Sequence, residues 1–333
     1  MTRSSYGDPR VERKLLAILR ILAAADAPIG GRNISAALRE HGIDLSERAV
    51  RYHLRLADER GLTQNLGEQG RVITDKGRME IDSARASEKL GFIISKIDSL
   101  SYRTTFDLEK QQGRIVLNVS LIPQKQFPEA LGIMKEVFRA GYCMSELVAV
   151  YQSGERVGEV AVPEGMIGFG TVCTVTLNAV LLQQGIPVES KYGGVLEVRG
   201  GEPYRFTELV SYSGSTVDPT EMFIVGGRTS VREASITGNG RILASFREVP
   251  AVVEGDLDDL FTRYNSLGLG GILAVGRAGQ PLLEVPVGLD RIGLTIVAGL
   301  TPVAALAEAD IPVTNKAMSA IVDYADLMPV WDL

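Results

Sequence analysis

The chain has 333 residues, of which 45% are hydrophobic and 23% charged, and its formal net charge is −6. This composition excludes a disordered chain, is enough for two or three domains, and leaves no apolar run long enough to cross a membrane. Because it has only two cysteines, Cys143 and Cys173, and its first residues lack the apolar core of a secretion signal, we expect a cytoplasmic protein with no disulfide framework and no metal site.

Charge is distributed unevenly along the chain. Residues 1–85 carry 15 Lys and Arg against 12 Asp and Glu, whereas residues 86–333 carry 20 against 29. A slightly basic first part followed by an acidic body is typical of a DNA-binding module attached to a regulatory one.

Three helices are predicted in the first part. Apolar residues recur at helical spacing through 11–25 and again through 34–38, where Gly42 ends the second helix. Ser46 is a suitable N-cap for the third, because its hydroxyl can accept a hydrogen bond from the first turn, and Gly61 closes that helix.

The third helix has one apolar and one basic face. Val50, Leu54 and Ala57 lie on the stripe that is expected to face the core. The other stripe carries Arg48, Arg51, Tyr52 and Arg55. Guanidinium groups at this spacing can pair with the edge of guanine or neutralise phosphates, although an ordinary solvated helix face has the same pattern.

A short hairpin is predicted directly after this helix. Strands at 62–65 and 71–74 flank the turn 67–70, and Arg71 stands where a wing residue could reach a phosphate or the minor groove. Helix, turn, helix and hairpin in this order indicate a winged helix-turn-helix that docks on double-stranded promoter DNA. RNA binding is a lesser alternative, since the head also resembles the winged-helix domain that precedes ribonuclease R catalytic regions, but no nuclease motif follows.

A connecting helix is predicted between the two parts of the chain. Its apolar face comprises Leu90, Ile93, Ile94, Ile97 and Leu100. That face suits either packing against a core or a short dimer seam. We therefore divide the chain into a DNA-binding head at 1–82, a linker helix at 83–110 and a body at 111–333.

The body contains one unit twice. Residues 167–191 and 292–316 are identical at ten of 25 aligned positions, including an Ile-Pro-Val triplet in each. Weaker matches extend the two repeats to 113–198 and 240–328. Such a duplication implies two copies of one α/β unit.

Each copy is expected to have the order β-α-β-β-β-α-β. In the first copy the expected strands are 114–120, 147–151, 157–162, 167–175 and 187–198, with helices at 127–140 and up to 184. The second and third strands should form a hairpin, and Thr176 should cap the second helix because Thr301 precedes a proline at the equivalent place. The fold class is α+β: a winged helix-turn-helix followed by a duplicated α/β sandwich.

The two copies differ at the start of their second helix, where free backbone N–H groups form a natural anion site. The first copy has Cys173, Thr174, Thr176 and Asn178, and the second has Ala298, Gly299, Thr301 and Val303. A small anionic effector should therefore prefer the first copy. The alternative is that Cys173 is a small buried hydrophobe and Thr176 only a cap.

The charge partner of such an anion is a choice among three residues, namely Arg228, Lys191 and Lys316. Arg228 follows two glycines in the connector 199–235, which is either a loop over the pocket or a surface connector. No dinucleotide fingerprint, P-loop or serine elbow is present, and the only two histidines lie in the head, so we assign no catalytic residue and no cofactor.

The head followed by GTVCTVTLN, YSGSTVDP and GGRTSV resembles the NrpR family, the nitrogen-regulatory repressors of methanogenic archaea. The resemblance extends from about Glu12 to Pro329, and GTVCTVTLN is its most specific part. It implies a homodimer or higher homo-oligomer that represses nitrogen-assimilation and nitrogen-fixation promoters. It also implies that 2-oxoglutarate binds the regulatory domain and weakens DNA binding, with Cys173 and Thr174 as effector-site or interface residues.

Two other functions stay open at this point. The chain could be a metabolic or keto-acid-binding enzyme with a winged-helix head, although a histidine-free body offers it only carboxylates, lysines and tyrosines. It could also be a co-regulator whose winged helix contacts only protein partners.

Overall fold

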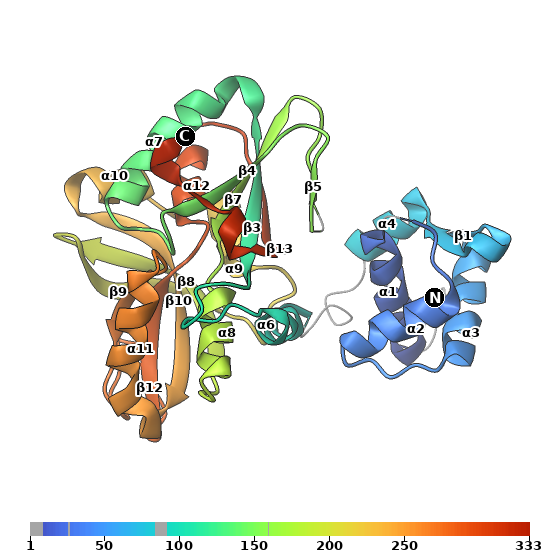
Figure 1. The fold of residues 1–333 in the computed structure, drawn as a ribbon, viewed down its shortest axis with the longest axis horizontal. Helices are drawn as coiled ribbons and strands as arrows, with labels where there is room; N and C mark the ends of the chain where they lie inside the picture. The colour runs from blue at the N-terminus through green and yellow to red at the C-terminus, as the bar shows by residue number, and fades with distance from the viewer. Residues whose placement is uncertain (1–8, 26, 84–91, 159) are drawn as a thin grey trace, which may run out of the picture. The chain divides into compact units, whose positions relative to one another are not determined.

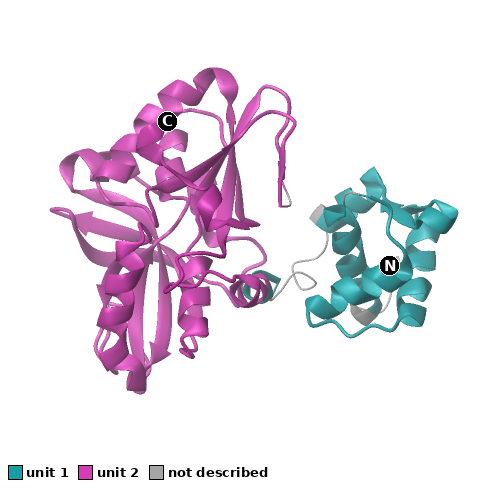
Figure 2. Cartoon of the chain, viewed as in Figure 1, with its two compact units in different colours: residues 1–95 teal, residues 96–333 magenta. Residues whose placement is uncertain are grey.

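The computed structural model describes residues 9–25, 27–83, 92–158 and 160–333, which belong to two units, 1–95 and 96–333 (Figure 2). Each unit has hydrophobic clusters of its own. Within the described ranges, no helix is long and apolar enough to cross a membrane.

The first unit is a winged helix-turn-helix (Figure 1). Its elements are α1 (Pro9–Ala24), α2 (Gly31–Glu40), α3 (Glu47–Glu59), β1 (Thr63–Asn65), β2 (Arg71–Ile73) and α4 (Asp75–Ser83). Strands β1 and β2 pair in antiparallel fashion across a 3-10 turn at Gly67–Gln69. The three helices and the hairpin predicted for the head are confirmed.

The sequence signals that define α3 act as predicted. Ser46 accepts a hydrogen bond from the amide of Ala49 at 3.3 Å, which caps the helix. Val50 and Leu54 are fully buried in the small core of this unit. At the far end, Arg60 donates two hydrogen bonds of 2.8 Å to the carboxylate of Glu12 on α1. These contacts fix the orientation of α3 and leave its basic face exposed.

The connecting helix ends earlier than predicted. It is α6 (Phe92–Arg103), and it buries Ile97 and Leu100 as its apolar pattern suggested. It ends at Arg103 because the hydroxyl of Thr104 bonds back to a carbonyl of the last turn and the chain then pairs with the start of the next strand. The predicted apolar residue Leu90 lies outside the described residues.

The second unit contains both copies of the repeat. The first copy comprises β3 (Arg114–Pro123), α7 (Phe127–Arg139), β4 (Leu147–Tyr151), β7 (Met166–Val172), α8 (Val175–Gln183) and β8 (Glu189–Arg199). The second copy comprises β10 (Gly240–Pro250), α11 (Glu254–Ser266), β11 (Ile272–Val275), β12 (Arg291–Val297), α12 (Thr301–Ala307) and β13 (Thr314–Asp323). The elements correspond one to one, which confirms the duplication.

The two copies exchange their last strands. One antiparallel sheet has the order β13-β3-β7-β4-β14, where β14 is Met328–Pro329, and the other has the order β11-β12-β10-β8-β9, where β9 is Glu202–Ser211. Strand β13 of the second copy thus pairs with β3 of the first, and β8 of the first pairs with β10 of the second. Helix α12, which directly precedes β13 in the chain, also lies with the first copy and packs against α7. The copies are therefore interlocked, whereas the sequence suggested two successive units.

The predicted hairpin of 147–151 with 157–162 is wrong. The later segment forms its own two-stranded ribbon, β5 (Arg156–Val157) with β6 (Val160–Ala161), while β4 pairs with β7 and β14. Glycines of β7 explain this pairing, because at Gly168 and Gly170 the missing side chains leave room for Tyr151 and Ala149 of β4.

The connector 199–235 is not a bare loop. It contains β9, which lies at the edge of the second sheet, followed by α9 (Pro219–Val225) and α10 (Val231–Thr237). The YSGSTVDP stretch joins β9 to α9, and the carboxylate of Asp218 caps α9 by accepting from the amide of Thr220 at 2.8 Å.

Thr176 and Thr301 are not helix caps, contrary to the prediction. The hydroxyl of Thr176 accepts a hydrogen bond from the amide of Val116 at 3.1 Å and lies 3.3 Å from the carbonyl oxygen of Val116. The hydroxyl of Thr301 donates to the carbonyl of Leu243 at 3.0 Å. Val116 and Leu243 occupy equivalent places on the first strands, β3 and β10. Each threonine therefore fastens a helix start to the first strand of its own copy.

We expect Gly299→Ala to destabilise the second unit by about 2 kcal/mol, as overpacked cores do. Gly299 lies in the turn between β12 and α12, where an added Cβ would overlap the carbonyl oxygen of Val172 and lie 2.5 Å from the side-chain amide nitrogen of Asn118. Urea unfolding monitored by circular dichroism measures the effect. Gly132→Ala in α7, where a Cβ meets open space, is the matched control and should be neutral or slightly stabilising. Equal unfolding midpoints for the two variants would contradict the close approach at Gly299.

Candidate functional site

Two regions of the chain have the chemistry of functional sites, one in each unit. The first is the exposed face of α3. Arg48, Arg51, Tyr52 and Arg55 all lie on this face and are exposed, as predicted. Arg51 is held by an ion pair with Glu47 one turn earlier. Among the described residues, no acidic side chain pairs with Arg48 or Arg55, so both guanidinium groups are available to a phosphate or a base.

The structure corrects the role expected of Arg71. Its Nε donates to the carboxylate of Asp58 on α3 at 2.9 Å, and only 16% of its side chain is exposed. Asp58 also accepts from the hydroxyl of Thr63 at the start of β1. Arg71 therefore holds the hairpin against α3, and this geometry argues against its use as a wing contact with DNA.

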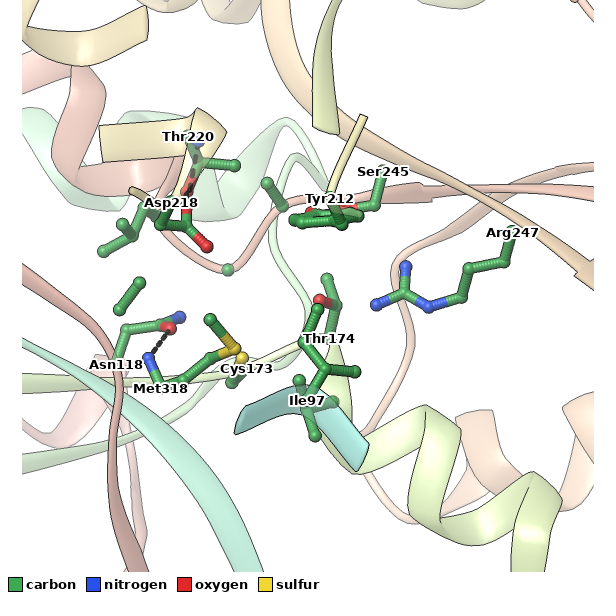
Figure 3. A pocket seen from close by; sticks show the side chains of 15 residues that line it. Ile97, Asn118, Cys173, Thr174, Tyr212, Asp218, Thr220, Ser245, Arg247 and Met318 are labelled. Atoms are coloured by element: carbon green, nitrogen blue, oxygen red, sulfur yellow. Dashed lines mark hydrogen bonds between the residues drawn. The ribbon is translucent and has the colours of Figure 1, made fainter. Parts of the chain in front are cut away.

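The second region is a cavity inside the body, where the two copies meet (Figure 3). The turn before α8 contributes Cys173, Thr174 and Val175, and the equivalent turn before α12 contributes Ala298, Gly299 and Leu300. The other walls include Ile97 of α6, Tyr212 and Asp218 of the connector, and Arg247 of β10. The cavity measures about 20 Å³, room for roughly one water molecule.

Arg247 is the most unusual residue of this cavity. Its side chain is 1% exposed, and within the described residues its Nη1 has no hydrogen-bond partner and no acidic group is paired with it. Burial lowers the pKa of this guanidinium, but arginine stays charged at neutral pH. A buried charge without a counter-charge is costly, so the arrangement indicates a site that an anion completes.

Neighbouring side chains hold Arg247 in place. Its Nε donates to the side-chain oxygen of Asn178, whose amide nitrogen in turn donates to the hydroxyl of Ser190 at 3.0 Å. At the equivalent position on β3 the first copy has Ser120, which bonds to Asn315. Only one of the two related halves therefore provides a cation, and the chain has one anion site of this kind within its described residues.

Cys173 and Thr174, the residues predicted to bind an effector, line the cavity, and both are buried. Burial raises the pKa of the Cys173 thiol to about 11, so the group is neutral at physiological pH and is not a nucleophile. It can serve as a small packing surface and weak hydrogen-bond donor for a ligand.

The remaining predicted residues have other places. Asn178 supports Arg247 from behind, and Thr176 is used by the backbone of Val116. Arg228 is wrong as a charge partner: its side chain is 53% exposed and forms an ion pair with Glu208 on β9. Lys191 is likewise engaged, by Glu189 and Glu248.

Sequence reasoning missed Arg247 although a signal was present. The residue interrupts the apolar strand β10, whose other central residues are buried. Charged residues almost never occupy a fully buried position unless something pairs with them. Arg247 and Glu248 are the only charged residues in the otherwise uncharged run from Ile242 to Val249, so the pattern of the strand marks them as candidate ligand residues.

Comparisons with known proteins agree with both regions. Residues 90–329 match the family described as NrpR regulatory domains NRD1 and 2, and residues 16–81 match the ribonuclease R winged-helix domain. A Methanosarcina mazei protein named global nitrogen regulator NrpRI is 36% identical over 97% of this chain and 99% of its own length. The global nitrogen regulator NrpR of Methanocaldococcus jannaschii is 31% identical over 95% of this chain and 55% of its own length.

A solved structure is also similar. It is a nitrogen repressor-like protein from Methanococcus jannaschii, with a TM-score of 0.61 and 28% sequence identity, which covers 72% of this chain and 98% of that one. The relatives that span most of this chain are named as regulators and not as enzymes.

Proposed function

The chain belongs to the NrpR family of global nitrogen regulators, and on that premise we propose that it represses nitrogen genes by binding their promoters. The genes are those of nitrogen assimilation and fixation, and the ligand that relieves repression is 2-oxoglutarate. The observation that carries this proposal is the combination of a winged helix whose Arg48 and Arg55 have no acidic partner among the described residues with a cavity whose buried Arg247 has none there either.

The winged helix supplies the DNA contact. Helix α3 enters the major groove with Arg48, Tyr52 and Arg55 toward the bases and phosphates. A homodimer presents two such helices to an inverted repeat, with half-sites about one helical turn, roughly 34 Å, or a multiple of it apart. Such a regulator acts in the cytoplasm, where it meets the promoter.

The cavity supplies the effector site. One carboxylate of 2-oxoglutarate binds Arg247, which offers an unused donor and a full positive charge. Cys173 and Thr174 contact the rest of the molecule. Because the cavity of about 20 Å³ is smaller than a five-carbon dicarboxylate, the ligand selects a more open arrangement of the walls.

That selection is the basis of regulation. An effector changes DNA affinity only through unequal binding to two arrangements of the protein, with a coupling typically about 1–3 kcal/mol. The wall that includes Ile97 belongs to α6, the helix that follows the head in the chain. A movement of α6 when the cavity opens is therefore transmitted along the chain to the DNA-binding module.

Gel-shift titration of a nitrogen-gene promoter, with and without 2-oxoglutarate, tests the proposal. We expect a specific, salt-dependent shift that weakens about 5- to 150-fold when the ligand is added. A shift that 2-oxoglutarate does not change would contradict the effector, and a shift that is equal on random DNA would contradict the repressor. No shift at all would favour a co-regulator that binds protein only, and turnover of the keto acid would favour an enzyme.

A further inference from the structure

The cavity is lined by a carboxyl group as well as by the cation. Asp218, in the connector between the two copies, is buried and lines the same cavity as Arg247. Its Oδ1 accepts from both the amide and the hydroxyl of Thr220, which fastens the group in place. Figure 3 shows Asp218 and Arg247 on different walls, with a carboxylate oxygen of Asp218 directed toward the space between them.

Charged and titratable groups from several elements interact with Asp218. They are Lys96 of α6, Glu221 of α9, Cys173 before α8 and Tyr212 after β9. Lys316 of β13 acts on Glu221, and Arg247 of β10 lines the same cavity. Burial raises the pKa of Asp218, whereas its hydrogen bonds to Thr220 and the charge of Lys96 lower it. Burial also raises the pKa of Glu221, whose carboxylate accepts from the amide of Ala317 on the cavity wall. Asp218 is therefore the buried carboxyl group of the cavity lining, and the partly buried Glu221 lies behind it on α9.

We propose that Asp218 is a specificity-determining residue of the effector site. It takes up one proton from water when a dicarboxylate binds, and its protonated carboxyl group donates a hydrogen bond to the ligand. Its hydrogen bond goes to the ligand carboxylate that is not bound by Arg247. The inference rests on the proposed effector site and adds the recognition of the second carboxylate.

The reason is electrostatic. Arg247 neutralises one ligand carboxylate, and the other meets Asp218 in a space with little water. Two carboxylates in contact at a buried site do not both stay ionised, because each raises the proton affinity of the other. One proton shared between them converts repulsion into a short, charge-assisted hydrogen bond. The proton comes from solvent on binding and returns to solvent on release, so the step is balanced.

The sign of the pH dependence follows from this proton uptake. The bound anion raises the pKa of Asp218 above its value in the free cavity, which is itself above the ordinary 3.8. Affinity is therefore greatest at low pH and falls as pH rises between these two pKa values. The fall approaches tenfold per pH unit, the limit for one linked proton.

Calorimetric titration of the full chain with 2-oxoglutarate tests the proposal. The titration is repeated in two buffers of different ionisation enthalpy, neither of them a carboxylate or a phosphate, which could compete at Arg247. For the natural chain we expect the apparent enthalpy to change with buffer by an amount that corresponds to uptake of close to one proton. 2-Oxovalerate, which lacks the second carboxylate, should bind without uptake.

Asp218→Asn separates the proton from the hydrogen bond. Asparagine is a good helix cap and its amide donates where the protonated carboxyl would, so the variant should fold, bind 2-oxoglutarate and take up no proton. Asp258→Asn, at an exposed position of α11, is the matched control and should behave as the natural chain. Buffer-independent enthalpy in the natural chain, or uptake retained in Asp218→Asn, would overturn the role of Asp218. Absence of any binding by the natural chain would overturn the effector site as a whole.

Discussion

Arg247→Met should abolish the response to 2-oxoglutarate and leave promoter binding intact. The substitution keeps most of the side-chain volume but removes the only buried cation that lines the described cavity. Truncation of one partner of a buried, hydrogen-bonded charge pair costs about 2–5 kcal/mol, so we expect the dissociation constant of the ligand to rise about 30-fold or more. Calorimetric titration measures the affinity, and the gel shift should then persist at ligand concentrations that release the natural chain.

Stability distinguishes this effect from misfolding. In the free protein Arg247 is a buried charge without a counter-charge among the described residues, so its removal relieves a cost that offsets the lost hydrogen bond to Asn178. The melting temperature of Arg247→Met should therefore not fall. Arg228→Ala is the control, because this exposed arginine is paired with Glu208 and should leave ligand affinity unchanged. Ligand binding by Arg247→Met within threefold of the natural value would place the effector elsewhere.

The double variant Arg48→Ala/Arg55→Ala should lose operator recognition while its effector binding stays normal. The two side chains lie two turns apart on the exposed face of α3. A well-placed guanidinium contributes about 1–3 kcal/mol to recognition. Replacement of both arginines should therefore weaken specific binding roughly 30-fold to 10⁴-fold. If both contact phosphates instead, the loss should be equal on specific and random DNA and the salt slope should fall by about 2. Quantitative gel shifts over a range of salt concentrations distinguish the two outcomes.

The control for the double variant in α3 must remove two positive charges from another part of the protein. Arg139→Ala/Arg277→Ala takes two positive charges from the second unit, far along the chain from α3. It should leave the shift unchanged apart from a small general effect of net charge. If this control loses DNA binding as strongly as the α3 variant, the recognition face is assigned wrongly.

Features encoded by neighbouring residues could be predicted from sequence. The cap at Ser46, the buried stripe of α3 and the hairpin after it depend on local spacing, and the structure has them. The duplication was visible as residue identity. The pairing of strands that are distant in sequence could not be predicted. The alternation of apolar residues indicates which face of a strand is buried, but not which strand lies beside it. The hairpin at 147–162 failed for that reason.

At the cavity, too, locally encoded features could be predicted and contacts between distant segments could not. Cys173 and Thr174 were found because they differ between the copies at a helix start, and the structure places both at the cavity. Arg228 is a candidate by charge alone, and in the structure it forms an ion pair with Glu208. Asp218 and Arg247 come from segments 29 positions apart that meet only in the folded unit, so no local pattern joins them.

The interlocked strands have a consequence for how such a site can arise. Two identical single copies that exchanged strands as a homodimer would carry every side chain twice, once on each side of the two-fold axis. An arginine at the position of Arg247 would then be buried in both halves, and each buried charge without a counter-charge is costly. Joining the copies in one chain frees each half to diverge, so that Ser120 can stand on one side and Arg247 on the other. Covalent linkage is thus what lets a symmetric architecture hold a single, polar, asymmetric ligand.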